Sequence, residues 1–239
     1  MKRQAFGLLL GLGVMLGAGG AQATQAQKYA LTLAGLPVGE LSMAVNEEGD
    51  RYTVRGTVRG GGLASLVVDF HYTGLASGWI RGATALRPIR YEGTRRLRGD
   101  ARTTTIRYNG VAPAEVRWDP GRNKRDYDID PGAQKNTLDP ASATYALLKD
   151  RPVAETCAQT VEIFDGTRRS RVVVAARQGD DKGFLCQGVY TRIAGFPADD
   201  MAERTRFPFT MYYEVRDGVA RMVRFQTTSI VGKVVARRQ

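Results

Sequence analysis

Apolar and polar side chains alternate with a period of two residues along much of the chain. The clearest case is the segment 51–59, in which Tyr52, Val54 and Val58 share one side while arginines and threonines share the other. Successive side chains of a β-strand point to opposite faces, so this segment predicts a strand with one apolar and one cationic face. Such one-sided alternation is typical of antiparallel sheets. The same period recurs at residues 29–34, 40–45 and 211–216.

Turn-forming residues separate the alternating segments at intervals of roughly 8–12 residues. The strongest signal is Asp217-Gly218, because an Asp-Gly pair suits the two-residue turn of a β-hairpin. We therefore expect a mainly β fold, in which an antiparallel sheet curls or forms a partly open barrel or sandwich with one or two short helices. Examples of these turn markers lie at residues 48–50, 60–62, 109–110, 119–121, 130–132, 165–166 and 217–218.

A helix is predicted from Pro140 to Lys149. The Asp139 carboxylate can accept hydrogen bonds from the first free amides, and proline suits the first helical position because no donor is needed there. Pro152 follows closely and ends the helix. Apolar side chains at 141, 145 and 148 share one face, which we expect to pack against the sheet. A second helical turn is expected at residues 198–203.

The N-terminus has the pattern of a secretory signal peptide. Two basic residues precede an apolar, acid-free run at residues 5–21, and Ala21-Gln22-Ala23 is a small-x-small cleavage site. We therefore expect residues 1–23 to be a cleavable signal peptide, with cleavage after Ala26 as a close alternative. An uncleaved membrane anchor is the weaker alternative, because a spanning helix needs about 20 strongly apolar residues and this run is rich in glycine.

The remainder, residues 24–239, contains no linker or low-complexity stretch. We expect a single β-rich domain exported to the periplasm, and two lobes meeting near residue 137 are compatible with it. Export favours a disulfide between Cys157 and Cys186, the only two cysteines, because the compartment is oxidising. The alternative, a redox-active or nucleophilic thiol, lacks a C-x-x-C spacing.

Composition limits the chemistry that the chain can perform. It has 239 residues, is 43% hydrophobic and 25% charged, and carries a formal net charge of +11. These values exclude wholesale disorder. One histidine and two cysteines exclude a His-rich metal centre and a multi-cysteine cluster, and no cofactor is expected.

The single histidine lies two residues after an aspartate. Asp69 and His71 would share one face of a strand and could form an acid–base pair. A catalytic triad would also need a nucleophile on a sharp turn, and the sequence has no G-x-S-x-G motif. These two residues are therefore weak catalytic candidates, and a partly exposed polar histidine is the more ordinary interpretation.

Three carboxylates at every second position, Asp126, Asp128 and Asp130, resemble the opening of a calcium-binding loop. Pro131 occupies the place of the required glycine, and Thr137 stands where a bidentate glutamate should be. The alternative is an extended segment whose acids face solvent near basic neighbours. These aspartates are weak metal candidates.

A strongly basic segment covers residues 87–107, with seven arginines and two acids. It could meet anionic lipid head groups, as in a peripheral membrane contact, or polyanionic envelope glycans. Export argues against nucleic acid as the partner. The alternative is a pair of solvent-facing strands whose charges prevent aggregation, within a chain that has 28 arginines against 7 lysines. The candidate ligand-binding residues are Arg87, Arg90, Tyr91, Arg95, Arg96 and Arg98.

The order and spacing of several landmarks resemble a bacterial exported family described as domain of unknown function 3108. They are the segments 29–39, 138–142, 157–169 and 186–196. The resemblance covers roughly residues 29–231 and implies a β-rich envelope protein without an established activity. It implies no catalytic residues, since the matching positions are turns, caps and cysteines.

Three classes of function fit these observations. The favoured one is a periplasmic, non-catalytic binding, carrier or envelope-support protein for an amphiphilic or anionic ligand, because a curled sheet can enclose an apolar cavity. The alternatives are an envelope-acting hydrolase using Asp69 and His71, and a scaffold that binds partners without a small ligand; an outer-membrane barrel fits the charged faces poorly. The sequence leaves the oligomeric state open. Aromatic residues that could line a cavity are Tyr29, Tyr72, Phe207, Phe209, Tyr212 and Tyr213.

Overall fold

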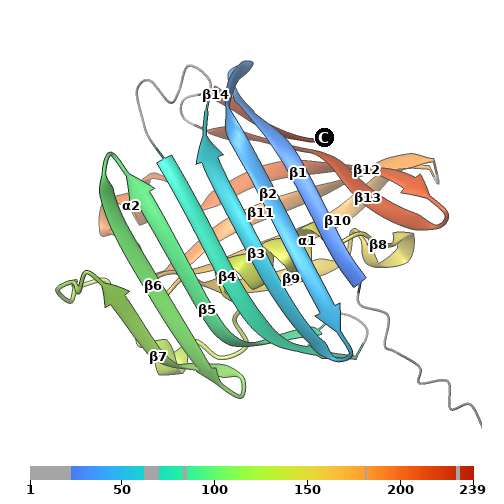
Figure 1. Ribbon diagram of the computed structural model, residues 1–239. Helices are drawn as coiled ribbons and strands as arrows, with labels where there is room; N and C mark the ends of the chain where they lie inside the picture. The colour runs from blue at the N-terminus through green and yellow to red at the C-terminus, as the bar shows by residue number, and fades with distance from the viewer. Residues whose placement is uncertain (1–22, 62–69, 83–84, 181, 230–231) are drawn as a thin grey trace, which may run out of the picture.

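The computed structural model describes residues 23–61, 70–82, 85–180, 182–229 and 232–239. Within these residues the chain forms one antiparallel sheet of fourteen strands with two short α-helices (Figure 1). The mainly β fold expected from the alternation is confirmed. The expected signal peptide lies almost entirely outside the described residues.

The strands follow one another along the chain with short connections in most places. In the first half they are β1 (Ala23–Leu33), β2 (Leu36–Glu48), β3 (Arg51–Gly60), β4 (Phe70–Arg81), β5 (Ala85–Leu97), β6 (Asp100–Asn109) and β7 (Ala112–Asp119). In the second half they are β8 (Arg151–Pro152), β9 (Gln159–Phe164), β10 (Arg169–Gly179), β11 (Gly183–Ala194), β12 (Arg206–Arg216), β13 (Val219–Ser229) and β14 (Gly232–Arg238). The helices are α1 (Pro140–Leu148) and α2 (Ala198–Glu203), with single 3-10 turns η2 (Pro131–Ala133) and η3 (Val153–Glu155).

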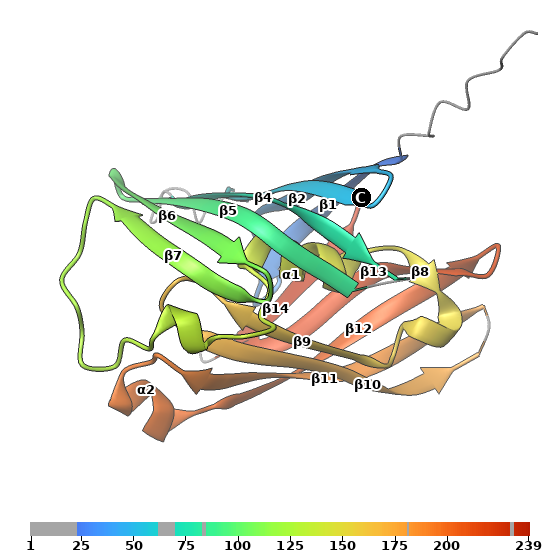
Figure 2. The same cartoon turned by 90° about the horizontal axis from the view of Figure 1, so that it is seen from below.

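The sheet is a continuous meander in two halves. Its strand order runs from β7 back to β1, crosses to β14, and continues down to β9, while β8 pairs with β13. The first and last strands are therefore neighbours, with Tyr29 opposite Arg238 and Leu33 opposite Val234. Among the described residues β7 and β9 are the two ends of the path, so the sheet curls without closing. Figure 2 shows the two halves as facing layers with α1 between them.

Helix α1 is the centre around which the sheet curls. It starts as expected, because the buried Asp139 carboxylate accepts hydrogen bonds from the amides of Ala141 and Ser142 at 3.0 and 2.9 Å. Its Ala141 and Tyr145 belong to the apolar cluster inside β2–β6, whereas Ala143 belongs to the cluster inside β9–β14. One short helix thus supplies core to both halves of the sheet, and the expected packing against the sheet is confirmed.

The C-terminal end of α1 is tied to the sheet by buried and half-buried charged side chains. The guanidinium of Arg151 donates to the carbonyl of Ala146 and, at 3.3 Å, to that of Lys149, where helical carbonyls lack partners. Asp150 accepts two hydrogen bonds from Arg238 of β14, at 2.7 and 3.1 Å. The helix is therefore anchored where the first and last strands meet.

The segment between β7 and α1 lies along the open edges of the sheet. Leu138 forms a parallel bridge with Ile163 of β9, donating its amide to the Glu162 carbonyl at 2.8 Å. The amide of Asn136 donates to the carbonyl of Val111, beside β7, at 2.7 Å. This segment thus connects the two edge strands through its own backbone.

The predicted disulfide is present. Cys157 follows η3, and Cys186 is fully buried on β11, with a Cα–Cα distance of 5.4 Å. The bond fixes the chain just before β9 to the middle of the second half. No helix among the described residues has the length and apolar character to cross a bilayer.

Candidate functional site

An apolar, partly open chamber with a volume of about 630 Å³ lies mainly inside the second half of the sheet. Its wall is formed by β1, β2, β10–β14 and the face of α1 that carries Leu147. A volume of this size lies within the usual range for a small-molecule site. The side chains that dominate the wall are Tyr29, Leu147, Phe207, Phe209, Met211 and Phe225.

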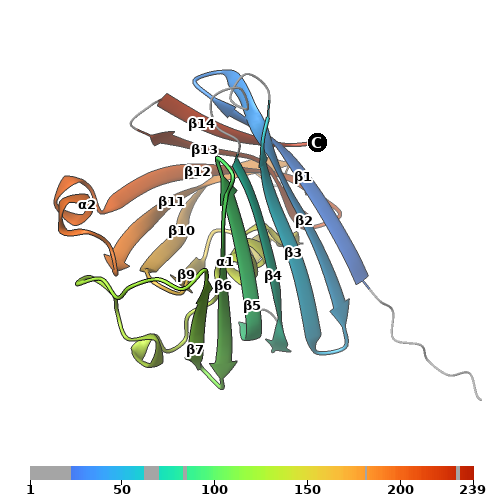
Figure 3. The same ribbon diagram turned by 60° about the vertical axis from the view of Figure 1, so that its left-hand side comes forward.

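Burial along the wall falls from one end of the chamber to the other. Tyr29, Met211 and Met222 are at most 2% exposed, whereas Tyr190 and Phe207 are only half-buried. Tyr190 and Phe207 are paired on β11 and β12. Helix α2 connects these two strands at this end of the sheet (Figure 3). The chamber therefore has a closed inner end under α1 and an accessible end at α2.

The polar side chains nearest the inner end, Tyr29 and Gln27, are uncharged. The Tyr29 hydroxyl donates to Oε1 of Gln27 at 2.9 Å, and Nε2 of Gln27 donates to the carbonyl of Leu148 at 3.2 Å. Burial raises the pKa of Tyr29 to about 12, so its hydroxyl stays protonated at neutral pH. This end offers a ligand apolar surface with internally paired polar groups behind it.

The accessible end carries cations stacked on aromatic rings. The guanidinium carbon of Arg192 is 5.0 Å from the ring centroid of Phe207 and 5.4 Å from that of Phe196. Arg204, just after α2, lies 4.8 Å from the Phe207 ring. Both arginines line the chamber, together with Glu203. The mouth therefore combines aromatic surface with positive charge.

On the other side of α1 the interior is a packed layer of tyrosines. The hydroxyls of Tyr72 and Tyr91 are 2.6 Å apart, and that of Tyr52 lies 2.8 Å from the Ser142 hydroxyl. Burial raises the pKa of Tyr72 to about 12, and it raises the pKa values of Tyr52 and Tyr91 further. These phenols are therefore neutral core groups that pair with one another and with α1.

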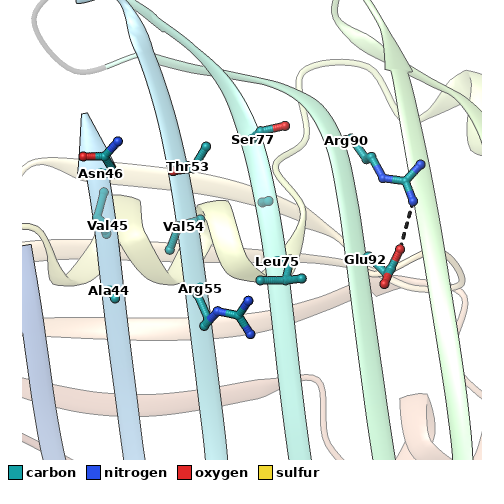
Figure 4. Close-up of a pocket in the computed structure, with 11 residues that line it drawn as sticks. Ala44, Val45, Asn46, Thr53, Val54, Arg55, Leu75, Ser77, Arg90 and Glu92 are labelled. Carbon is teal, nitrogen blue, oxygen red and sulfur yellow. Dashed lines mark hydrogen bonds and ion pairs between the residues drawn. The ribbon is translucent and has the colours of Figure 1, made fainter. Parts of the chain in front are cut away.

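The candidate basic segment is divided between different surfaces. Arg90 lies on the outer face of β5, in a shallow hollow of about 460 Å³, and pairs with Glu92 at 2.8 Å (Figure 4). Tyr91 is buried on the inner face, and Arg87 donates to Asn136 at 3.1 Å. Arg95, Arg96 and Arg98 are exposed near the β5–β6 hairpin. The structure does not bring these residues together around the apolar chamber, which lies in the other half of the sheet.

The candidate acid–base pair can be placed only in part, because Asp69 lies outside the described residues. His71 sits on β4, and its Nε2 is 3.2 Å from the Thr73 hydroxyl. Together with Thr94 and Arg96 these two residues line a hollow of about 260 Å³. His71 is therefore a half-buried residue at the surface of the first half.

The three candidate metal-binding aspartates face different partners. Asp128 pairs with Arg122 at 2.6 Å and accepts a hydrogen bond from the Arg125 amide at 2.9 Å. The hydrogen bond from Arg122 lowers the pKa of the Asp128 carboxyl. Asp130 caps η2 by accepting the Gly132 amide at 3.1 Å, while Asp126 is exposed. Within the described ranges no three His, Cys, Asp or Glu side chains gather in a metal-binding arrangement.

The aromatic candidates also separate by position. Tyr29, Phe207 and Phe209 line the chamber. Tyr72 belongs to the tyrosine layer, Tyr213 stacks on Phe184 at 5.2 Å, and Tyr212 lies under Arg224 at 3.6 Å.

Sequence reasoning missed the two arginines at the mouth of the chamber. A period of two from Tyr190 places Arg192 on the same face of β11, so this signal was present in the sequence. It could not be used without knowing which strands face each other. Arg204 lies in an irregular connection that has no period.

Comparison with solved structures finds a likeness to the crystal structure of a β-barrel-like protein of the domain of unknown function DUF1849 from Brucella abortus. The sequence identity is 12%, the match covers 90% of this chain and 94% of that chain, and the TM-score is 0.47. A comparison with curated proteins finds no match. The profile of the family described as protein of unknown function (DUF3108) matches residues 28–182, more than half of the chain. The chain therefore belongs to the DUF3108 family.

Proposed function

We propose that this protein is a non-catalytic binding or carrier protein that holds the apolar chain of an amphiphilic molecule in the chamber inside β10–β14. The observation that carries the proposal is the chamber of about 630 Å³, whose wall is apolar and whose lining rings Tyr190 and Phe207 are only half-buried. Apolar surface facing a cavity lacks the contacts that a packed core would supply. An alkyl chain would supply them.

The energy available from such binding is substantial. Burial of a methylene group contributes about 0.8 kcal/mol, so a chain of about ten methylenes gives on the order of 8 kcal/mol before the costs of association. The neutral pairing of Tyr29 and Gln27 leaves no unpaired charge at the inner end. The methyl end of a chain therefore fits the end under α1.

An envelope location is part of the proposal. The predicted signal peptide at residues 1–23 and the disulfide between Cys157 and Cys186 support export to the periplasm. In that compartment a chamber of this kind would shield a lipid-like chain from water, and a peripheral contact with the membrane would load or unload it. The scaffold and hydrolase alternatives predict no occupant in the chamber.

The test fills the chamber without changing the outer surface. Ala236 of β14 lines the chamber, whereas the next residue back, Val235, faces the other side of the sheet. Ala236→Trp should place an indole in the cavity and weaken binding of a fluorescent fatty-acyl probe at least about tenfold, while Val235→Trp should bind as the parent protein does.

Native mass spectrometry of protein purified from the periplasm without detergent is the second measurement. A mass excess that disappears on denaturation, and that Ala236→Trp lacks, supports the carrier function. Binding that is equal in the parent protein and Ala236→Trp overturns it. A ligand-free protein that also fails to bind the probe overturns it too, and favours the scaffold alternative.

A further inference from the structure

We propose that the ligand of the chamber carries an anionic oxyanion head group, a carboxylate or a phosphate, and that Arg192 and Arg204 bind it beside α2. This inference rests on the proposed function, because it assigns the polar end of the same ligand. It places the head group in the second half of the sheet, away from the basic segment of β5.

The arginines at this end are arranged in a stack with aromatic rings. Arg168 lies 5.3 Å from the centroid of Phe196, Arg192 lies between Phe196 and Phe207, and Arg204 lies 4.8 Å from Phe207. Such cation–π contacts hold guanidinium groups in fixed orientations over apolar surface. The charge is therefore positioned before a ligand arrives.

The hydrogen bonds of Arg192 fix its place further. Its Nη1 donates to the main-chain carbonyls of Asp200 and Arg204, the latter at 3.0 Å. Nε of Arg204 donates to the carbonyl of Arg206 at 2.8 Å. These bonds are to neutral acceptors, so they hold the guanidinium groups without neutralising them.

The three stacked arginines, Arg168, Arg192 and Arg204, lack carboxylate partners within the described part of the chain. No Asp or Glu oxygen described there comes within 4.0 Å of their guanidinium nitrogens. By contrast Arg122, Arg169, Arg171 and Arg238 each pair with an acid. Half-buried charges are normally compensated by an opposite charge.

Three acidic residues lie close in sequence to Arg204 and affect which head group can bind there. Glu203 lines the chamber beside Arg204, and Asp199 and Asp200 lie on α2. The contact of Asp200 with Arg192 runs through its main-chain carbonyl. An anionic head group between Arg192 and Arg204 would supply the missing counter-charge, and Glu203 would favour a head group small enough to avoid its carboxylate.

The experiment compares ligands with one chain and different head groups. Calorimetry would measure binding of dodecanoate, dodecyl phosphate, dodecyl maltoside and dodecyltrimethylammonium, each below its micelle concentration, to the full mature chain. The two anions should bind about tenfold or more tightly than the cation, and added salt should reduce that difference. The ratio of the two anions distinguishes a carboxylate ligand from a phosphate ligand.

Variants separate the charge of the mouth from the fold. Arg204→Gln should weaken binding of the two anions by about tenfold and leave the affinity for dodecyl maltoside unchanged. Arg204→Glu should reverse the preference, so that the cation binds more tightly than the anions. Arg206→Gln, an exposed neighbour on β12 outside the chamber wall, is the matched control and should change nothing. Arg192→Gln removes bonds to α2, so its thermal unfolding is measured beside its binding.

The outcomes distinguish this inference from the proposed function. Equal affinity for all four head groups, together with loss of binding in Ala236→Trp, keeps the chamber as the site and overturns the anionic assignment. An equal loss of anion binding in Arg206→Gln also overturns it. Failure of every probe to bind overturns both.

Discussion

The ring of Phe209 lies against Gly188, its partner on the neighbouring strand. A Cβ at Gly188 would come within 2.2 Å of the Cε2 and Cζ atoms of that ring. The glycine thus lets a chamber-lining ring lie on the sheet rather than project into the cavity. Met211 and Phe225 line the same chamber.

Replacing this glycine should therefore affect both stability and binding. Gly188→Ala forces the Phe209 ring away from the sheet, and overpacking of this kind costs about 1–3 kcal/mol. We expect a lower midpoint of urea unfolding and weaker binding of a fatty-acyl probe. Gly56→Ala on β3 is the control, because its Cβ would meet nothing within 4 Å. Equal unfolding midpoints for both variants would contradict the proposed contact.

Local patterns predicted much of the fold because they report on local backbone geometry. The alternation along β3 agrees with buried Tyr52 and Val54 between exposed neighbours. The Asp217-Gly218 turn joins β12 to β13, with both residues at positive φ as this turn requires. Asp139 caps α1 as its position before a proline predicted.

The chamber could not be predicted in the same way, because it depends on contacts between distant segments. The pairing of β1 with β14 places Tyr29 and Ala236 in one wall, and no pattern within either strand specifies that partner. The same limit applies to Arg192 and Phe207, which meet only because α2 returns the chain beside β11. The basic segment was the stronger signal in sequence, since charge density is visible without knowledge of the fold.

The buried Asp139 should make stability depend on pH. Burial raises the pKa of this fully buried carboxyl from 3.8 to about 6, although it accepts the Ser142 hydroxyl at 2.6 Å. A carboxyl with a raised pKa binds its proton more tightly in the folded state. The contribution of Asp139 to the free energy of unfolding is therefore fully present below about pH 4 and is lost as the pH rises through about 6.

Asp139→Asn tests this dependence because asparagine can still cap the helix but cannot ionise. Between these two pH values the free energy of unfolding of the parent should fall relative to that of the variant, by up to roughly 3 kcal/mol. Urea unfolding at several pH values measures the difference, in which contributions from the other carboxyls cancel. Parallel pH profiles for the two proteins would show that burial does not perturb this group.

The disulfide should contribute through the unfolded chain. Cys157 and Cys186 are separated by 29 positions, and a loop of about 30 residues gives roughly 3.5 kcal/mol in the chain-entropy description. Cys157→Ala combined with Cys186→Ala should lower the free energy of unfolding by about that amount. A reductant should destabilise the parent protein and leave the double variant unchanged. A reductant effect on both proteins would assign the loss to another cause.

The ion pair between Asp150 and Arg238 should couple α1 to the last strand. The two side chains are about 20% exposed and share two hydrogen bonds, and the bond to Asp150 raises the pKa of Arg238. Asp150 also accepts a hydrogen bond from Nε2 of Gln27 at 3.3 Å, behind the inner end of the chamber. Asp150 also lies 3.7 Å from Nε of Arg221. Removing Asp150 therefore leaves Arg238 without its acid, whereas removing Arg238 leaves Asp150 with only this longer contact.

A double-mutant cycle measures this coupling. Asp150→Asn and Arg238→Gln should each cost about 1–3 kcal/mol, and the double variant should cost less than their sum, because the contact between these two side chains can be lost only once. Arg237→Gln, on the exposed side of β14, is the matched control and should change stability little. Strict additivity would show that the two groups act independently. A double variant that costs less than the sum would show that the segment after α1 and the last strand are coupled through this pair, and loosening the pair should then also weaken ligand binding through Gln27 and Tyr29.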